Sequence, residues 1–169
     1  SHAFNLTSTR LYCGYYLNEL ILKLLPEGEQ NTEVFSLYAL SLERLAKKEE
    51  IEPVLRSFEL ALLTILGYAP DFKRDHTGSA ISPASIYQYL NGIGFVALAD
   101  YEGRLDAYSG RDLHRMADQC FLDSDEFAGS SRIEFLKASK RLMRQLVNCA
   151  LNGKKLNSRQ LFIKTNEEG

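Results

Sequence analysis

The segment PVLRSFELALLTILGY, residues 53–68, restricts the possible folds more than any other part of the chain. Arg56 and Glu59 are its charged residues, and apolar side chains cover nearly the whole helical circumference. Pro53 suits the first turn of a helix and Gly67 suits its end, so the two residues mark a helix between them. A helix that is apolar on almost all sides has to be buried. We therefore predict a central helix that other elements surround.

Two further helices are predicted on the amino-terminal side of this segment. The first begins after the capping residues 7–9 and runs to about Leu25, where Pro26 interrupts it. The second follows Asn31 and covers residues 33–50. Its apolar side chains fall on one stripe, namely Val34, Leu37, Tyr38 and Leu45. The first third of the chain is therefore predicted to be helical.

Residues 70–130 differ in character and are predicted to form a small inserted region. A polar loop is followed by the runs IYQYL and FVALA, which are separated by NGIG and predict a hairpin. The run SGRDLHRMADQCF predicts a short helix capped near Ser109 or Gly110, and an acidic loop follows it. The predicted fold class is mainly α (all-α or α+β), with one helical domain over residues 1–169 that carries this hairpin and loop region.

The last long helix is predicted to begin at Ser131 and to end at Asn152 and Gly153. Ser131 and Glu134 match the spacing of a capping box. The apolar residues of the helix share one face, which consists of Ile133, Leu136, Met143, Leu146, Val147 and Ala150. The residues after Gly153 are predicted to add a short turn or helix.

Positive charge is concentrated near the end of the chain. Nine basic residues and one acidic residue lie between Arg132 and Lys164, whereas residues 1–131 hold 11 Lys and Arg against 19 Asp and Glu. The candidate contacts lie opposite the apolar stripe or just beyond the helix, and they are Lys137, Lys140, Arg141, Arg144, Lys154, Lys155 and Arg159. Nucleic-acid phosphate is the predicted partner. An acidic protein tail and a solvated polar face are the alternatives.

Arg56 lies about one turn inside the predicted central helix, with apolar residues on the same face. An arginine above an apolar face fits a peptide that ends in an apolar side chain and a carboxylate. The alternative is a salt bridge to Glu52 or Glu59.

The chemistry-bearing residues do not form a recognisable catalytic or metal-binding pattern, so we expect a protein that is not an enzyme and has no cofactor or metal. The three histidines are isolated, and no metalloprotease, nucleophile-elbow or phosphate-loop motif occurs. The three cysteines are far apart, which disfavours a disulfide framework or a zinc site and favours a reducing cytoplasm. No apolar stretch approaches the roughly 18 residues of a membrane span.

Four blocks along the chain carry a resemblance to a known family, namely LYCGYYLNELILKLL, LRSFELALLTILGYAPDF, GFVALADYEGRLDAYSGRDL and KRLMRQLVNCALNGKKLNSRQLF. In sequence and in order they resemble the RecO family of bacterial DNA repair proteins. The resemblance covers about Leu6 to Lys164, and RSFELALLTILGY and GKKLNSRQLF are its most specific parts. It implies the carboxy-terminal portion of RecO without the amino-terminal OB-fold domain. Some members hold zinc in the inserted region, but residues 70–95 of this chain contain no cysteine.

The resemblance implies a recombination mediator of the RecFOR type, without enzymatic turnover, at the bacterial nucleoid in the cytoplasm. Its implied partners are single- and double-stranded DNA, RecR and the acidic carboxy-terminal tail of the single-stranded DNA-binding protein, SSB. That tail ends in Ile-Pro-Phe, which fits an arginine above an apolar groove. The implied tail site consists of Arg56, Leu17, Leu20, Leu55, Leu60 and Leu63. The alternative function is a protein-interaction module whose basic face binds an acidic partner rather than DNA.

Overall fold

The computed structural model describes residues 8–100, 103–123, 130–159 and 161. It contains five helices and a three-stranded antiparallel sheet, which confirms a mainly α fold with a small β region. The chain divides into two compact units. One consists of Ser1–Tyr68 with Val147–Gly169, and the other is Ala69–Leu146.

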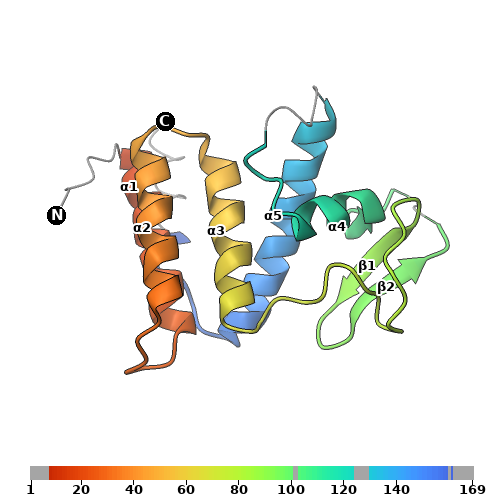
Figure 1. The fold of residues 1–169 in the computed structure, drawn as a ribbon, viewed down its shortest axis with the longest axis horizontal. Helices are drawn as coiled ribbons and strands as arrows, with labels where there is room; N and C mark the ends of the chain where they lie inside the picture. Colours follow the sequence, from red (N-terminus) through yellow and green to blue (C-terminus); the bar gives the residue numbers. More distant parts are fainter. Residues whose placement is uncertain (1–7, 101–102, 124–129, 160, 162–169) are drawn as a thin grey trace. The chain divides into compact units, whose positions relative to one another are not determined.

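Three helices begin the first unit: α1 (Ser8–Leu24), α2 (Thr32–Ala46) and α3 (Ile51–Ile65) (Figure 1). Each packs against the other two. Nine residues of α3 are buried, so the prediction of a buried central helix is confirmed. The helix begins two residues before the predicted Pro53, because Ile51 and Glu52 are already helical. Arg56 consequently lies deeper in the helix than the sequence suggested.

Side chains at the helix ends fix this arrangement. The Asn31 side chain accepts a hydrogen bond from the Val34 amide at 3.1 Å and so caps α2. At the other end of α2, Arg10 Nη1 donates to the carbonyl oxygens of Leu45 (2.9 Å) and Glu49 (2.8 Å). A cation at the carboxyl end of a helix also complements the helix dipole. Arg10 therefore fastens α1 to the end of α2.

The second unit is built on strands β1 (Ile86–Leu90), β2 (Gly94–Leu98) and β3 (Ala107–Ser109), in the order β2-β1-β3. The predicted hairpin is confirmed as β1 and β2. Strand β3, which pairs with β1, was not predicted. It leads directly into α4 (Gly110–Ala117), which Ser109 caps by accepting a hydrogen bond from the Asp112 amide at 3.1 Å.

The last helix, α5 (Ser130–Leu151), begins one residue before the predicted Ser131, so Ser131 is not its N-cap. Three members of the predicted apolar face are not buried, because Ile133 is exposed and Leu136 and Ala150 are half-buried. The described first turns bury Phe135 instead, whose ring stacks on Phe121 at a centroid distance of 5.6 Å. Further along, the helix buries Ala138, Ser139, Leu142, Met143, Leu146 and Val147. The buried face is therefore rotated at the start of α5 and agrees with the prediction from Met143 to Val147.

Candidate nucleic-acid interface

Four basic residues of α5 lie on the exposed side of the helix. Lys137, Lys140, Arg141 and Arg144 are all exposed, and each is followed or preceded by residues of the buried face. Spacings of three and four residues bring them to one side of the helix, as predicted. We call these four residues the α5 basic face. They belong to the unit Ala69–Leu146.

The local contacts of the α5 basic face leave its charge accessible. Lys137 Nζ lies 3.7 Å from Glu134 Oε1, but both side chains are more than half exposed, and such pairs are weak. Arg141 lies near the Tyr108 hydroxyl of β3. Burial raises the pKa of Tyr108, and the neighbouring Arg141 opposes that shift. Arg141 therefore has a neighbour in the sheet in addition to its exposed position on the helix.

The remaining basic candidates belong to the other unit. Lys154 and Lys155 are exposed, and Lys154 Nζ donates to the carbonyl oxygen of Lys23 at 3.1 Å. Arg159 is half-buried, and its Nη2 donates to Asn148 Oδ1 at 3.0 Å. Lys164 lies outside the described residues. Both Lys154 and Arg159 therefore have a structural contact as well as a charge.

Glu19 of α1 holds this carboxy-terminal segment in place. Its Oε1 accepts hydrogen bonds from the Ser158 amide (3.1 Å) and hydroxyl (2.8 Å), and its Oε2 accepts one from the Asn157 amide (3.0 Å). Burial on its own raises the pKa of Glu19, but these hydrogen bonds outweigh burial, so the pKa is lowered. The ionised carboxylate thereby positions Arg159.

Arg56 lies in a buried ion-pair network. Its Nε donates to Glu59 Oε2 at 2.7 Å, its Nη2 to Glu59 Oε1 at 3.0 Å, and its Nη1 to Glu52 Oε2 at 2.9 Å. The Tyr16 hydroxyl completes the network by donating to Glu59 Oε1 at 2.6 Å. The predicted alternative, a salt bridge to Glu52 or Glu59, is therefore confirmed for both partners.

Burial and the neighbouring charges together set the protonation states of Arg56 and Tyr16. Arg56 and Glu59 are 5% and 3% exposed. Burial lowers the pKa of Arg56, but the carboxylates of Glu59 and Glu52 outweigh it and raise the pKa, so the guanidinium stays charged. Burial, together with the adjacent Glu59, raises the pKa of Tyr16 well above its usual 10.0. Tyr16 therefore acts as a hydrogen-bond donor throughout the physiological range.

The leucines predicted to form the walls of a tail-binding groove lie in the helical core of this structure. Their exposed fractions range from 0% to 7%, and they are Leu17, Leu20, Leu55, Leu60 and Leu63. Their place in the packing of α1 against α3 follows from the apolar periodicity of both helices. Glu52 is half exposed, so the Arg56 network meets solvent at Glu52.

The comparison with known families decides the identity of the chain. The family model described as "Recombination protein O C terminal" matches residues 6–165. The chain belongs to the RecO C-terminal family. The resemblance noted in the sequence is thereby confirmed over its whole predicted extent, Leu6 to Lys164.

Curated RecO relatives match along almost all of the chain. The DNA repair protein RecO of Methylococcus capsulatus is 40% identical over 158 residues, which is 93% of this chain and 60% of that protein. The Pseudomonas aeruginosa protein of the same name is 39% identical over 162 residues, which is 96% of this chain and 65% of that protein. The Aliivibrio salmonicida protein is 34% identical over 164 residues, with the same coverage. The chain thus spans 60–65% of the length of these curated RecO relatives.

The described part of this RecO-family chain holds no group of three or more His, Cys, Asp and Glu that could bind a metal ion. His76 and His114 are both used structurally, with Nδ1 of His76 3.2 Å from the Phe95 carbonyl and Nε2 of His114 2.7 Å from that of Ile81. Among the described helices, none is both long and apolar enough to span a membrane.

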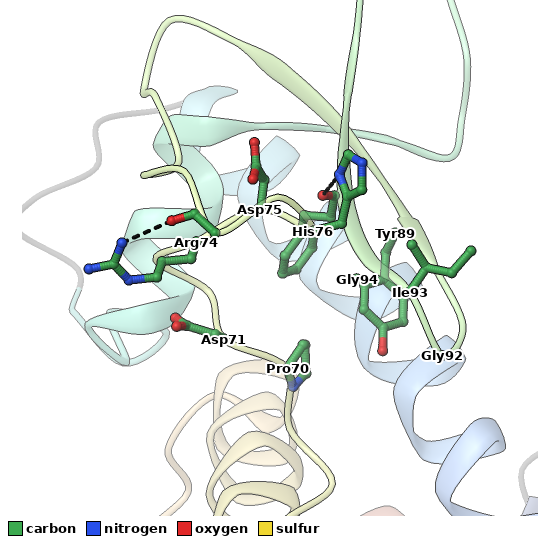
Figure 2. Close-up of a pocket in the computed structure, with 11 residues that line it drawn as sticks. Pro70, Asp71, Arg74, Asp75, His76, Tyr89, Gly92, Ile93 and Gly94 are labelled. Atoms are coloured by element: carbon green, nitrogen blue, oxygen red, sulfur yellow. Dashed lines mark hydrogen bonds between the residues drawn. The ribbon is translucent and has the colours of Figure 1, made fainter.

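The structure also contains a hollow that the sequence analysis missed. It has a volume of about 480 Å³ and lies between the loop after Pro70 and the turn of the β1–β2 hairpin (Figure 2). Arg74 and His76 come from the loop, and Tyr89 and Ile93 come from the hairpin. The loop HTGSAISPAS and the turn NGIG were both recognised, but their proximity depends on tertiary contacts. The backbone amide of His76, which donates to the Phe95 carbonyl at 2.8 Å, is one of these contacts.

Proposed function

We propose that the chain is a non-enzymatic DNA-repair module that holds the phosphate backbone of DNA on the α5 basic face. The observation that carries this proposal is the exposure of Lys137, Lys140, Arg141 and Arg144 on one side of a single helix. The relatives are named as DNA repair proteins, which makes DNA the first candidate among anionic partners. If the chain acts in a RecFOR-type pathway, RecR is a further partner and the protein acts at the bacterial nucleoid.

Phosphate binding of this kind needs positive charge without base-specific geometry. Lysine and arginine contacts to phosphates release counterions, so affinity falls as salt rises and depends little on sequence. The α5 basic face can make such contacts with single or double strands, because both carry the same phosphates. Lys154, Lys155 and Arg159 supply further charge in the other unit.

The test is binding of a fluorescent single-stranded oligonucleotide at low salt. The variant carries Lys137→Glu, Lys140→Glu and Arg144→Glu, and it retains Arg141 because that residue lies near the Tyr108 hydroxyl. We expect this variant to lose at least about tenfold in affinity, since three attractive contacts become repulsive. A helix signal in circular dichroism equal to that of the wild type shows that the variant is folded.

A matched control separates the position of the charge from its amount. Arg44→Glu, Lys47→Glu and Lys48→Glu change the net charge equally but lie on or just after α2. We expect this control to bind DNA far more tightly than the α5 variant. Equal loss in both would refute the α5 basic face. Absence of wild-type DNA binding at low salt would instead favour the alternative, a module whose basic face binds an acidic protein.

We also propose that the chain docks the acidic tail of SSB at the Arg56 network. The supporting observation is Glu52, whose Oε2 lies 2.9 Å from Arg56 Nη1 while its side chain is 47% exposed. The Glu52 carboxylate already occupies the position next to Arg56 Nη1, and a carboxylate of a bound peptide could take its place from the solvent side. The terminal carboxylate of the tail would replace Glu52 there, and its apolar side chain would have to displace part of the leucine core.

The test is binding of a labelled peptide that ends in Ile-Pro-Phe to the wild type and to Glu52→Gln. Removal of the competing carboxylate should tighten binding about fivefold, the equivalent of one charge-assisted contact of ~1 kcal/mol. Glu33→Gln, an exposed glutamate in the first turn of α2, is the matched control and should change nothing. Unchanged or weaker binding by Glu52→Gln would remove Arg56 from the tail site.

A further inference from the structure

The hollow beside the β1–β2 hairpin has the dimensions of a small-molecule site. Its volume of about 480 Å³ falls within the range of 300–1,000 Å³ that is usual for ligand pockets. Figure 2 shows His76 on the side of the loop next to the hairpin end with Tyr89 and Ile93, whereas the Arg74 side chain points away from the hairpin. All of these residues belong to the unit Ala69–Leu146, so the hollow is formed within one compact body.

One side of the hollow is an apolar and aromatic surface. The Tyr89 ring packs on the Phe95 ring at a centroid distance of 5.2 Å, and Phe95 in turn packs on Phe72 at 5.4 Å. Phe72 and Phe95 are buried, so Tyr89 is held by a rigid aromatic base while it remains half-buried itself. Ile93 extends this surface and is 60% exposed. A flat, partly apolar ligand can therefore lie against the hairpin end.

The other side supplies hydrogen-bonding groups with nearly balanced charge. The Asp75 carboxylate is committed to its own turn, where Oδ1 accepts from the Thr77 amide (2.8 Å), the Thr77 hydroxyl (2.6 Å) and the Ser79 amide (3.1 Å). Arg74 is exposed and uses Nη1 to donate to the Gly78 carbonyl at 2.9 Å, and a guanidinium carries further donors. The loop contributes one cation, Arg74, and two carboxylates, Asp71 and Asp75, to the lining of the hollow. This balance favours an uncharged ligand with hydrogen-bonding edges over a phosphate.

The hollow is connected to the α5 basic face by hydrogen bonds within the same unit. Gln145 follows Arg144 directly and lies one turn after Arg141. Its Nε2 donates to the Tyr89 carbonyl at 3.1 Å and to Asn91 Oδ1 at 3.0 Å. The Arg144 end of the α5 basic face is therefore next to the hairpin turn that borders the hollow. A DNA strand whose phosphates lie along this face would reach that turn.

We propose that the hollow receives one unpaired base of a single strand, stacked on Tyr89 and Ile93 with its polar edge toward the loop that carries His76. This inference rests on the proposed binding of DNA phosphates by α5 and adds a base site to it. A base in a duplex is stacked on its neighbours and cannot enter, so the hollow gives the chain a preference for single strands. Base stacking on aromatic side chains is tolerant of sequence, so the preference extends to all bases.

The test compares a deoxythymidine decamer with an abasic decamer that has the same phosphates. Stacking on one aromatic residue corresponds to at least about a fivefold gain in affinity, so the wild type should bind the deoxythymidine strand that much more tightly. Tyr89→Leu and Ile93→Ser should weaken binding of the deoxythymidine strand and leave binding of the abasic strand unchanged. Ile133→Ser is the matched control, because Ile133 is 55% exposed on the same unit but does not line the hollow.

The outcomes distinguish the two proposals. Equal wild-type affinity for both strands, or a folded Tyr89→Leu with an undiminished preference, would overturn the base site while DNA binding by α5 stands. If Tyr89→Leu does not fold, Ile93→Ser decides, since its side chain is at the surface. Failure of the wild type to bind either strand would overturn the proposed function and the base site together.

Discussion

Replacement of Arg56 by alanine tests the buried ion-pair network of the first unit. Glu59 is only 3% exposed, and the Arg56 guanidinium donates to both of its carboxylate oxygens, at 2.7 and 3.0 Å. The substitution removes both of these hydrogen bonds. The Tyr16 hydroxyl is the remaining partner of Glu59 among the described residues. Breaking a buried ion pair by removal of one partner typically costs 3–5 kcal/mol, because the other charge stays buried. Arg56→Ala should therefore lower the free energy of unfolding by about 4 kcal/mol.

The loss is a large part of the ~5–15 kcal/mol that stabilises an ordinary domain, so it is easily measured. The chain has no tryptophan, and urea unfolding is therefore followed by circular dichroism of the helices. Glu52→Gln should cost much less, because Glu52 is half exposed. The double variant Arg56→Met, Glu59→Leu should recover most of the stability, since apolar replacement of a whole buried pair is often neutral. A loss below about 1 kcal/mol in Arg56→Ala would refute the buried network, since that is the range of solvated surface pairs.

Three further predictions concern the thiols, the alkaline limit and one glycine. Burial raises the pKa of Cys13 to about 11, whereas Cys149 is exposed. At pH 8 a thiol reagent should therefore modify Cys149 rapidly and Cys13 only after unfolding. Rapid labelling of Cys13 in the folded chain would contradict its burial. The folded-state pKa of Tyr16 is raised above 10.0, so the contribution of Tyr16 to the free energy of unfolding is complete below pH 10 and is lost as the pH rises above that value. In urea titrations at pH 9 and 11, Tyr16→Phe should therefore lose less unfolding free energy between the two pH values than the wild type. A Cβ at Gly110 would lie 1.8 Å from the Ser82 carbonyl oxygen, so Gly110→Ala should cost about 1–3 kcal/mol by displacing backbone, and an unchanged melting temperature would contradict this close approach.

The helices of the first unit could be predicted because their signals are local. Apolar spacing, Asn31 before α2 and Gly67 after α3 define the helix limits within a few residues. Gly67 adopts a φ of 82°, which glycine accepts without strain. The same periodicity identified the buried face of α5 from Met143 to Val147. It failed at Ile133, because the ring of Phe121 selects Phe135 as its partner through tertiary packing.

The candidate sites were less predictable, because they depend on burial and on contacts between distant residues. The sequence placed Lys137, Lys140 and Arg144 on one helix face, and the structure confirms that they are exposed there. It gave Arg56 two interpretations, and local spacing could not decide whether Glu59 would be buried with it. Strand β3 has three residues, too few for a periodic signal, and it forms by pairing with β1. The hollow arises where two turns meet, which no single segment encodes.

The salt dependence of single-stranded DNA binding tests most directly whether the α5 basic face holds phosphates. Affinity is measured by fluorescence anisotropy at several salt concentrations for the wild type and for Lys137→Glu, Lys140→Glu, Arg144→Glu. If the four side chains of the face each neutralise one phosphate, the plot of log K against log salt should have a slope near −3 in the wild type, at about −0.7 per phosphate. The folded variant should bind more weakly, with a much shallower slope. A variant with the affinity and slope of the wild type would contradict the assignment of DNA binding to α5.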